Sequence, residues 1–187
     1  MMENKRDNKE FTSQVCSLRR VSRVKSGGKV LRFSALVVTG NQKGMVGYGL
    51  GRAAETRDAI QKAERAAQKN LIKVPFFKNR TIFHDICAKY CTAKVYLRKS
   101  KEGSGVIAGG SMRCIFEVLG VKDIVCKSVG TSNPHNVVKA TFEALKNLKT
   151  PRSVAEKRGK EMKDLFVNFK SQENMNENSI NIEGAKE

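Results

Sequence analysis

The sequence predicts an α/β fold of the α+β type, with a β-β-β-α domain followed by a β-β-α-β-α domain. Two runs of strand-like alternation each lead into helical periodicity, and a Pro-containing stretch separates them. The 187 residues, 40% of them hydrophobic, suffice for two modest cores. We expect a flexible N-terminus (1–10), a first domain (11–75), a linker (76–80), a second domain (81–149), a helical extension (150–170) and a disordered acidic tail (171–187).

The first domain begins as a three-stranded antiparallel meander. A β-branched and basic run over 15–25 predicts the first strand, and Lys25-Ser26-Gly27-Gly28-Lys29 predicts a tight turn. Alternating apolar residues over 31–37 predict the second strand. A polar turn at 39–43 and the segment 44–50 complete the meander.

A helix from about Ala54 to Leu71 follows the meander. Ile60, Ala63, Ala67 and Leu71 fall three or four residues apart and form one apolar stripe. Since alanine is small, we expect this helix to approach its sheet closely.

The second domain opens with two strands inside 81–98. A Gly-rich loop over 101–110 leads to a short helix that Ser111 is expected to cap and that ends near Leu119. A strand over 123–129 follows. Asn133 and Pro134 predict the start of a helix that runs to about Leu148, and Thr150-Pro151 opens a further helical stretch.

The charge indicates a polyanionic partner. The chain has 36 Lys and Arg against 18 Asp and Glu, a net charge of +18. Residues 1–75 hold 16 basic and 6 acidic side chains, residues 76–150 hold 13 and 5, and the remainder is balanced. Because the excess lies on the segments that are expected to fold, we predict nucleic acid as the partner and no membrane.

Other classes of protein find little support in the sequence. No apolar run is long enough for a membrane span, and the first ten residues resemble neither a secretory signal nor a transit peptide. Five cysteines suggest reduced and mostly buried thiols rather than a disulfide scaffold. With two His and no recognisable acid–base or nucleophile motif, we expect no enzyme, no catalytic residue and no cofactor.

Four short segments are candidate sites. The basic hairpin tip over 23–29 is the first, with RNA phosphate as its expected ligand. Gly47-x-Gly49-x-Gly51 before a helix fits close strand–helix packing better than a nucleotide fingerprint. The loop 103–110 fits a structural turn as well as an anion site. His84, Cys87 and Cys91 fall short of a tetrahedral zinc set, so no metal is expected.

Several blocks resemble one known family in their order and spacing. They are the Gly-Gly hairpin at 27–28, FSALVVTG at 33–40, GMVGYGLGRA at 44–53, AIQKA at 59–63, GSGVIAGGSMR at 103–113, GTSNPHNVVKAT at 130–141 and AEKRGK at 155–160. The chain resembles the bacterial-type small-subunit ribosomal protein five family over about Val15 to Leu165.

The resemblance implies a first domain similar to a double-stranded RNA-binding domain and a second domain with a left-handed βαβ unit. It implies binding to small-subunit rRNA and a role in assembly and translational accuracy on the mRNA entry side. It also implies ribosomal proteins four, eight and three as neighbours, only indirect contact with mRNA, and a single copy per ribosome, in the cytoplasm or an organelle. Its hairpin corresponds to Val21–Lys29, where Ser26 replaces a residue that is often basic in the family.

Combining charge and resemblance gives two sets of candidate residues. RNA binding is assigned to Arg19, Arg20, Arg23, Lys25, Gly27, Gly28, Lys29, Arg52, Arg57 and Arg113. A protein interface is assigned to Glu156, Lys157, Arg158, Gly159 and Lys160. Two alternatives stay open: a free-standing double-stranded RNA-binding protein, and a phosphotransferase-like enzyme, against which the missing phosphate-binding lysine motif argues.

Overall fold

The structure is a computed structural model that describes residues 11–77 and 80–161. It separates into two units, residues 1–148 and 149–187, and each is considered by itself. The expected flexible N-terminus, the acidic tail and residues 162–170 of the helical extension lie outside the described residues. No helix among the described residues is long and apolar enough to cross a bilayer.

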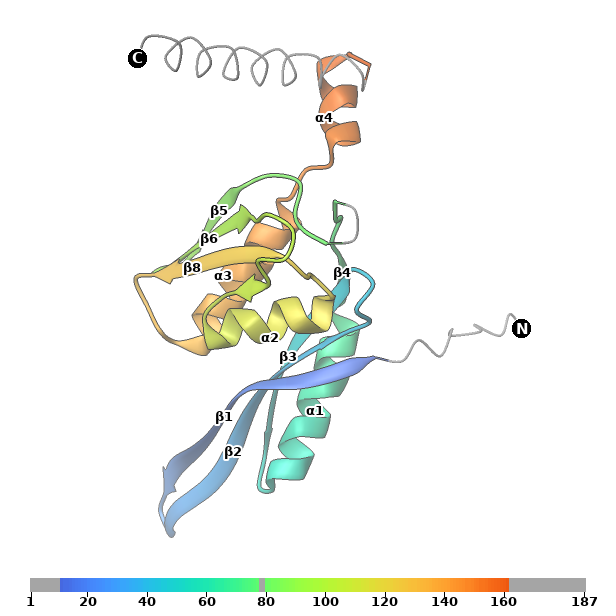
Figure 1. The fold of residues 1–187 in the computed structure, drawn as a ribbon. Coiled ribbons are helices and arrows are strands. Elements are labelled where there is room, and N and C mark those ends of the chain that lie inside the picture. Colours follow the sequence, from blue (N-terminus) through green and yellow to red (C-terminus); the bar gives the residue numbers. More distant parts are fainter. Residues whose placement is uncertain (1–10, 78–79, 162–187) are drawn as a thin grey trace, which may run out of the picture. The chain divides into compact units, whose positions relative to one another are not determined.

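The first sheet has the strand order β1-β2-β3-β4, with one helix packed on it (Figure 1). Its elements are β1 (Thr12–Lys25), β2 (Gly28–Gly40), β3 (Met45–Ala53), α1 (Thr56–Lys69) and β4 (Ile72–Lys73). The predicted meander and helix are confirmed. The two-residue strand β4 was not predicted, because such a short segment shows no periodicity.

The predicted hairpin turn is confirmed and its register is fixed. Lys25 pairs with Gly28, so Ser26 and Gly27 form a two-residue connection between long antiparallel strands. Gly28 has φ +126°, a conformation that L side chains rarely adopt, which explains a glycine at this position.

A row of glycines on β3 lies directly against a row of alanines on α1. Ala59, Ala63 and Ala67 are fully buried. A Cβ atom built on Gly49 would overlap the backbone of Ala63, and Gly47 and Gly51 stand in the same relation to Ala67 and Ala59. The close helix–strand packing expected from the sequence is therefore confirmed.

The expected apolar stripe of α1 is wrong in part. Ala59 takes the buried position that was assigned to Ile60, which is only half-buried, as is Leu71 beyond the helix. The glycine row leaves no room for a larger side chain, so the smallest residues of the helix face the sheet.

The second sheet has the order β5-β6-β8-β7 and carries two helices (Figure 1). Its elements are β5 (Ile86–Tyr90), β6 (Ala93–Lys99), β7 (Val106–Ile107), α2 (Gly110–Leu119), β8 (Ile124–Val129) and α3 (Pro134–Lys146). β7 and β8 are parallel and are joined by α2, which forms a βαβ unit. Its handedness stays a prediction.

Three local expectations for this half need correction or refinement. Gly109, not Ser111, occupies the N-cap of α2, and it offers no side-chain hydrogen bond. The strand expected from residue 81 begins only at Ile86, because Thr81 instead bridges to Phe77. Asn133 does occupy the N-cap of α3 ahead of Pro134, although its side chain makes no capping bond.

One apolar core joins the two sheets. It contains Leu36, Val38 and Val46 from the first sheet together with residues of α2, α3 and the second sheet. The Tyr48 and Phe142 rings meet edge-on at 4.5 Å between centroids. The β2–β3 turn also bonds α2, since the amide of Gln42 donates to the carbonyl of Val118 at 3.1 Å. Residues of the two predicted domains therefore share one core, while the cluster under α1 is separate from it, and the domain boundary stays a prediction.

The Gly-rich loop before α2 is held by a buried carboxylate. Asp123 is 3% exposed, and it accepts a bond from the Gly105 amide at 3.1 Å and one from Arg80 Nε at 3.1 Å. Gly105 has φ +71°. A backbone N–H group of the loop is thus bonded to a carboxylate of the same chain, as a structural turn would require.

Asp123 should make stability depend on acid pH. The Gly105 amide first, and then Arg80, hold the pKa of Asp123 below its ordinary value. Its contribution is present above the unfolded pKa of about 4 and is lost as pH falls through the lower folded pKa. Urea denaturation should show that the free energy of unfolding falls from pH 7 to pH 3. The fall should be smaller in Asp123→Asn, which is already less stable than the unsubstituted chain at pH 7. Parallel pH profiles for the two proteins would contradict this.

Candidate nucleic-acid interface

The first three strands carry many cations and no acid. They hold seven Lys or Arg residues and no Asp or Glu. Among the residues that the structure describes, none of these seven forms an ion pair with a side chain. Such a surplus of positive charge on neighbouring strands attracts anions.

The strand register sorts these cations onto two faces. Arg19 pairs with Ser34, which pairs with Arg52, so all three side chains lie on one face. Val21 with Arg32, and Arg23 with Val30, continue the same face toward the hairpin tip. We call this surface the basic face, and it consists of Arg19, Arg23, Lys25, Arg32 and Arg52.

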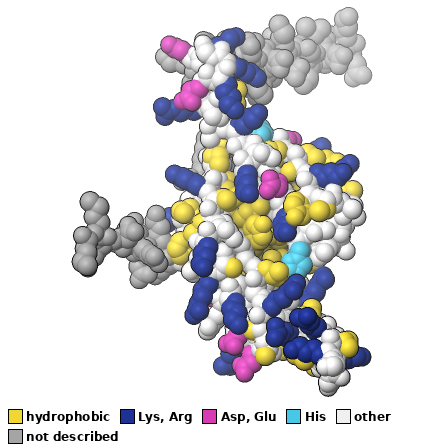
Figure 2. Space-filling model, turned by 180° about the vertical axis from the view of Figure 1, so that it is seen from behind, with side chains coloured by type: hydrophobic (Ala, Val, Ile, Leu, Met, Phe, Trp, Pro, Cys, Tyr) yellow, Lys and Arg dark blue, Asp and Glu magenta, His cyan; other side chains and the backbone are white. Residues whose placement is uncertain are grey.

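The basic face is the side of the sheet opposite α1. Helix α1 packs on the side that presents Ala35, Val37 and the glycines of β3. On the other side, Leu36 and Val38 enter the core shared with α2 and α3. Only the hairpin part of that side remains open, and Figure 2 shows Lys and Arg gathered over this end of the molecule.

A hollow of about 320 Å³ lies on the open hairpin. Its lining combines two valines, one serine and four cations: Val21, Ser22, Arg23, Lys25, Val30, Arg32 and Arg52. On the opposite face of the hairpin, Val24 is 70% exposed and Leu31 is 45% exposed. Guanidinium groups over an aliphatic floor suit a phosphate–ribose backbone, which presents charge and apolar sugar together.

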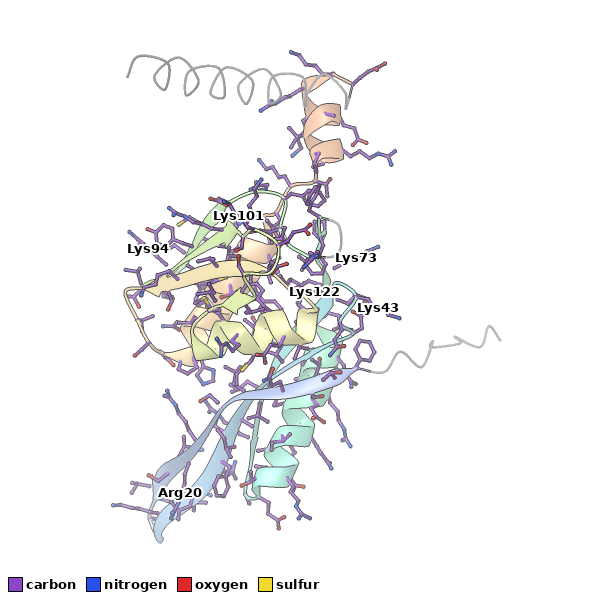
Figure 3. All side chains as sticks on the ribbon, viewed as in Figure 1. Arg20, Lys43, Lys73, Lys94, Lys101 and Lys122 are labelled. Carbon is purple, nitrogen blue, oxygen red and sulfur yellow. The ribbon has the colours of Figure 1, made fainter. Side chains whose placement is uncertain are left out.

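The predicted RNA-binding residues divide between surfaces. Arg19, Arg23, Lys25 and Arg52 share the basic face, whereas the register places Arg20 and Lys29 on the opposite face. Figure 3 labels Arg20 on the hairpin. Arg57 is in the first turn of α1, on the covered side of the sheet. Arg113 is on α2 and donates to the carbonyl of Val106 at 3.3 Å. Gly27 lies in the two-residue turn at the tip, and Gly28 is the first residue of β2. The assignments remain predictions.

The start of α3 adds residues that sequence reasoning missed. The pKa of His135 is lowered, first by burial and then by the positive charges of Arg19, Lys139 and Arg52. Helix α3 therefore begins beside the basic face. Lys139 also lies 5.0 Å from the Tyr90 ring centre and donates to its hydroxyl at 3.1 Å. Of the three unpredicted residues Arg32, His135 and Lys139, only Arg32 could have been found from the sequence, because it alternates with apolar residues on β2.

His135 makes a prediction on pH. Below about pH 6.5 the unfolded chain binds a proton that the folded His135 resists, so stability should fall as pH falls toward the lower folded pKa. In His135→Asn this part of the decline should disappear. Urea midpoints between pH 7.5 and 5.5 measure it, and an unchanged slope in the variant would show that His135 carries no such linkage.

The cysteines differ from expectation. Only Cys126 is buried, and burial raises its pKa to about 12. Cys16 and Cys114 are half-buried, while Cys87 and Cys91 are exposed. Cys87 lies on the outward side of β5, and Cys91 sits in the β5–β6 turn with φ +52°. No group of three or more His, Cys, Asp or Glu side chains within residues 11–77 and 80–161 could hold a metal ion.

The segment predicted as a protein interface forms a short helix and its cap. Helix α4 (Pro151–Arg158) is capped by Thr150, whose side chain accepts from the Ser153 amide at 3.2 Å. Gly159 ends the helix in the left-handed conformation. The side chains of Glu156 through Lys160 are exposed, and their role at an interface stays a prediction.

Comparison with known proteins identifies the family. Residues 11–75 match "Ribosomal protein S5, N-terminal domain" and residues 88–158 match "Ribosomal protein S5, C-terminal domain". The small ribosomal subunit protein uS5 of Ehrlichia canis (strain Jake) is 50% identical over 159 residues, 85% of this chain and 91% of that protein. The small ribosomal subunit protein uS5 of Ehrlichia ruminantium (strain Gardel) is 48% identical over 165 residues, which cover 88% of this chain and 95% of that protein. Two matching domains in the family's order, on a fold with two sheets, show that this chain belongs to the ribosomal protein S5 family.

Proposed function

We propose that this chain is a structural component of the small ribosomal subunit and binds its rRNA through the basic face. The observation that carries the proposal is the set of five cations on one open sheet surface, on strands without a single acid. Relatives about 50% identical are named small ribosomal subunit protein uS5, which supports the ribosomal setting.

The chemistry of the basic face suits structured RNA. A-form RNA has a deep, narrow major groove that side chains cannot read, so it is recognised mostly through its shape, phosphates and 2′-hydroxyls. Arginines at alternate positions of a sheet can follow such a backbone, and the projecting hairpin can extend into a gap between RNA helices. The role is binding and positioning, so we propose no catalytic step.

The protein neighbours and cellular setting belong to the proposal as well. We propose that Glu156 through Lys160 pack on ribosomal protein eight, that proteins four and three lie nearby, and that the chain works on cytoplasmic ribosomes near the mRNA entry. Its effect on mRNA would then be indirect, through the placement of these neighbours.

Sedimentation through a sucrose gradient in high salt tests the proposal. High salt weakens nonspecific phosphate contacts, so only an integral component should remain with the small subunit. We expect stoichiometric recovery of the chain in that peak. Recovery at the top of the gradient, with retained affinity for any RNA duplex, would instead favour a free-standing double-stranded RNA-binding protein.

A further inference from the structure

One face of the second sheet is open, and it differs in composition from the basic face. In β5, β6 and β8 alternate residues are buried under α3 and α2, among them Ala88, Val95, Leu97 and Cys126. The remaining residues point outward. We call this surface the outer face, and it consists of Cys87, Lys89, Lys94, Tyr96, Arg98, Ile107, Val125, Lys127 and Val129.

The strand register places aromatic, aliphatic and cationic side chains next to one another on the outer face. Tyr96 pairs with Lys127, Arg98 with Val125, and Lys94 with Val129 across β6 and β8. Ile107 of β7 continues the row beside Val125. Tyr96, Ile107 and Val129 are 40%, 53% and 48% exposed. These exposed parts are not covered by any other residue that the structure describes, so an external partner could contact them.

A hollow of about 360 Å³ lies on the outer face. Tyr96, Val125 and Val129 supply its apolar surface, and Arg98 and Lys127 supply two positive charges. The nearby acid is Asp85 at the edge, which accepts from the Lys99 amide at 2.9 Å and lies 4.0 Å from Arg98 Nε. Lys89 and Lys94 add further charge on β5 and β6, so the complementary occupant is an anion with a flat apolar group.

We propose that the outer face binds an unpaired RNA nucleotide, with the base stacked on Tyr96 and the flanking phosphates on Arg98 and Lys127. Unpaired bases stack on exposed aromatic side chains of open sheets, while cations beside the ring hold the backbone. A duplex would offer no free base face to Tyr96. The inference rests on the proposed function, because it takes the partner of the chain to be RNA.

Two RNA probes separate the outer face from the basic face. Binding of the full chain to fluorescein-labelled decauridine and to a 16-base-pair RNA duplex is measured by anisotropy. Tyr96→Ala should weaken decauridine binding about tenfold, as expected for the loss of one stacked base, and leave duplex binding within about twofold. Tyr96→Phe keeps the ring and should restore the affinity. Arg23→Gln with Arg52→Gln should show the reverse selectivity.

Each other outcome overturns a defined part of the inference. Equal decauridine affinity for Tyr96→Ala and the unsubstituted chain, with duplex binding intact, would overturn the inference alone. Equal weakening by Tyr96→Phe would exclude stacking. Tighter, Tyr96-dependent binding of a decaglutamate peptide would assign the outer face to an acidic protein segment. An unsubstituted chain that binds neither RNA would overturn the proposed function together with this inference. A urea midpoint for each variant confirms that it is folded.

Discussion

Gly49→Ala is expected to destabilise the protein by about 3 kcal/mol or more. A Cβ at this position would meet the Ala63 carbonyl and lie 2.5 Å from the amide nitrogen of Ala67. Both are backbone atoms of α1, so no side-chain rotamer can relieve the overlap. The helix must move away from β3 and lose the burial of its alanines, which urea denaturation followed by circular dichroism would measure.

Gly27→Ala is the matched control for this substitution. Gly27 lies at the exposed hairpin tip, and a Cβ built there meets nothing within 4 Å. Gly27 is also absent from the residues with positive φ. We expect the free energy of unfolding of the Gly27→Ala variant to differ from that of the unsubstituted chain by less than about 0.5 kcal/mol. If Gly49→Ala were equally harmless, the close contact between β3 and α1 described above would be wrong.

Replacing Arg23, Arg32 and Arg52 together by Gln should lower affinity for duplex RNA about 100-fold near 0.1 M salt. The three residues project from β1, β2 and β3 on one face. If each neutralises one phosphate, the slope of log affinity against log salt should become shallower by about 2 to 3 units. A salt titration of the binding constant measures both quantities in the same experiment.

A triple substitution elsewhere controls for the loss of net charge. Lys43, Lys73 and Lys122 are exposed and lie far from the hairpin tip (Figure 3). Their replacement by Gln removes the same charge and should change the salt slope much less. The arginine variant should also stay at least as stable as the parent, because it relieves repulsion between like charges. Equal salt slopes for both triple variants would show that RNA affinity depends on the net charge of the chain and not on the position of these arginines on the basic face.

Much of the fold followed from local patterns. The Ser-Gly-Gly turn, the alternation in β2, the Asn-Pro start of α3 and the alanine spacing of α1 each specify one conformation through backbone sterics or side-chain period. The strands β4 and β7 have two residues each, so no period exists to detect them. Ser111 has a side chain suited to capping, yet Gly109 takes the N-cap because the preceding loop positions it there.

The sequence by itself determined the basic character of the folded segments, the order of the longer elements and the membership of the family. Only the tertiary structure decided which cations act together. Two adjacent glycines permit two hairpin registers, and a shift of one residue would move every side chain of β1 to the other face of the sheet. The observed pairing of Lys25 with Gly28 places Arg19 and Arg23 beside Arg32 and Arg52, and leaves Arg20 on the far side. Likewise, only the packing of α2 and α3 on one side of the second sheet leaves Tyr96 exposed on the other, because strand alternation gives two faces without saying which will be covered.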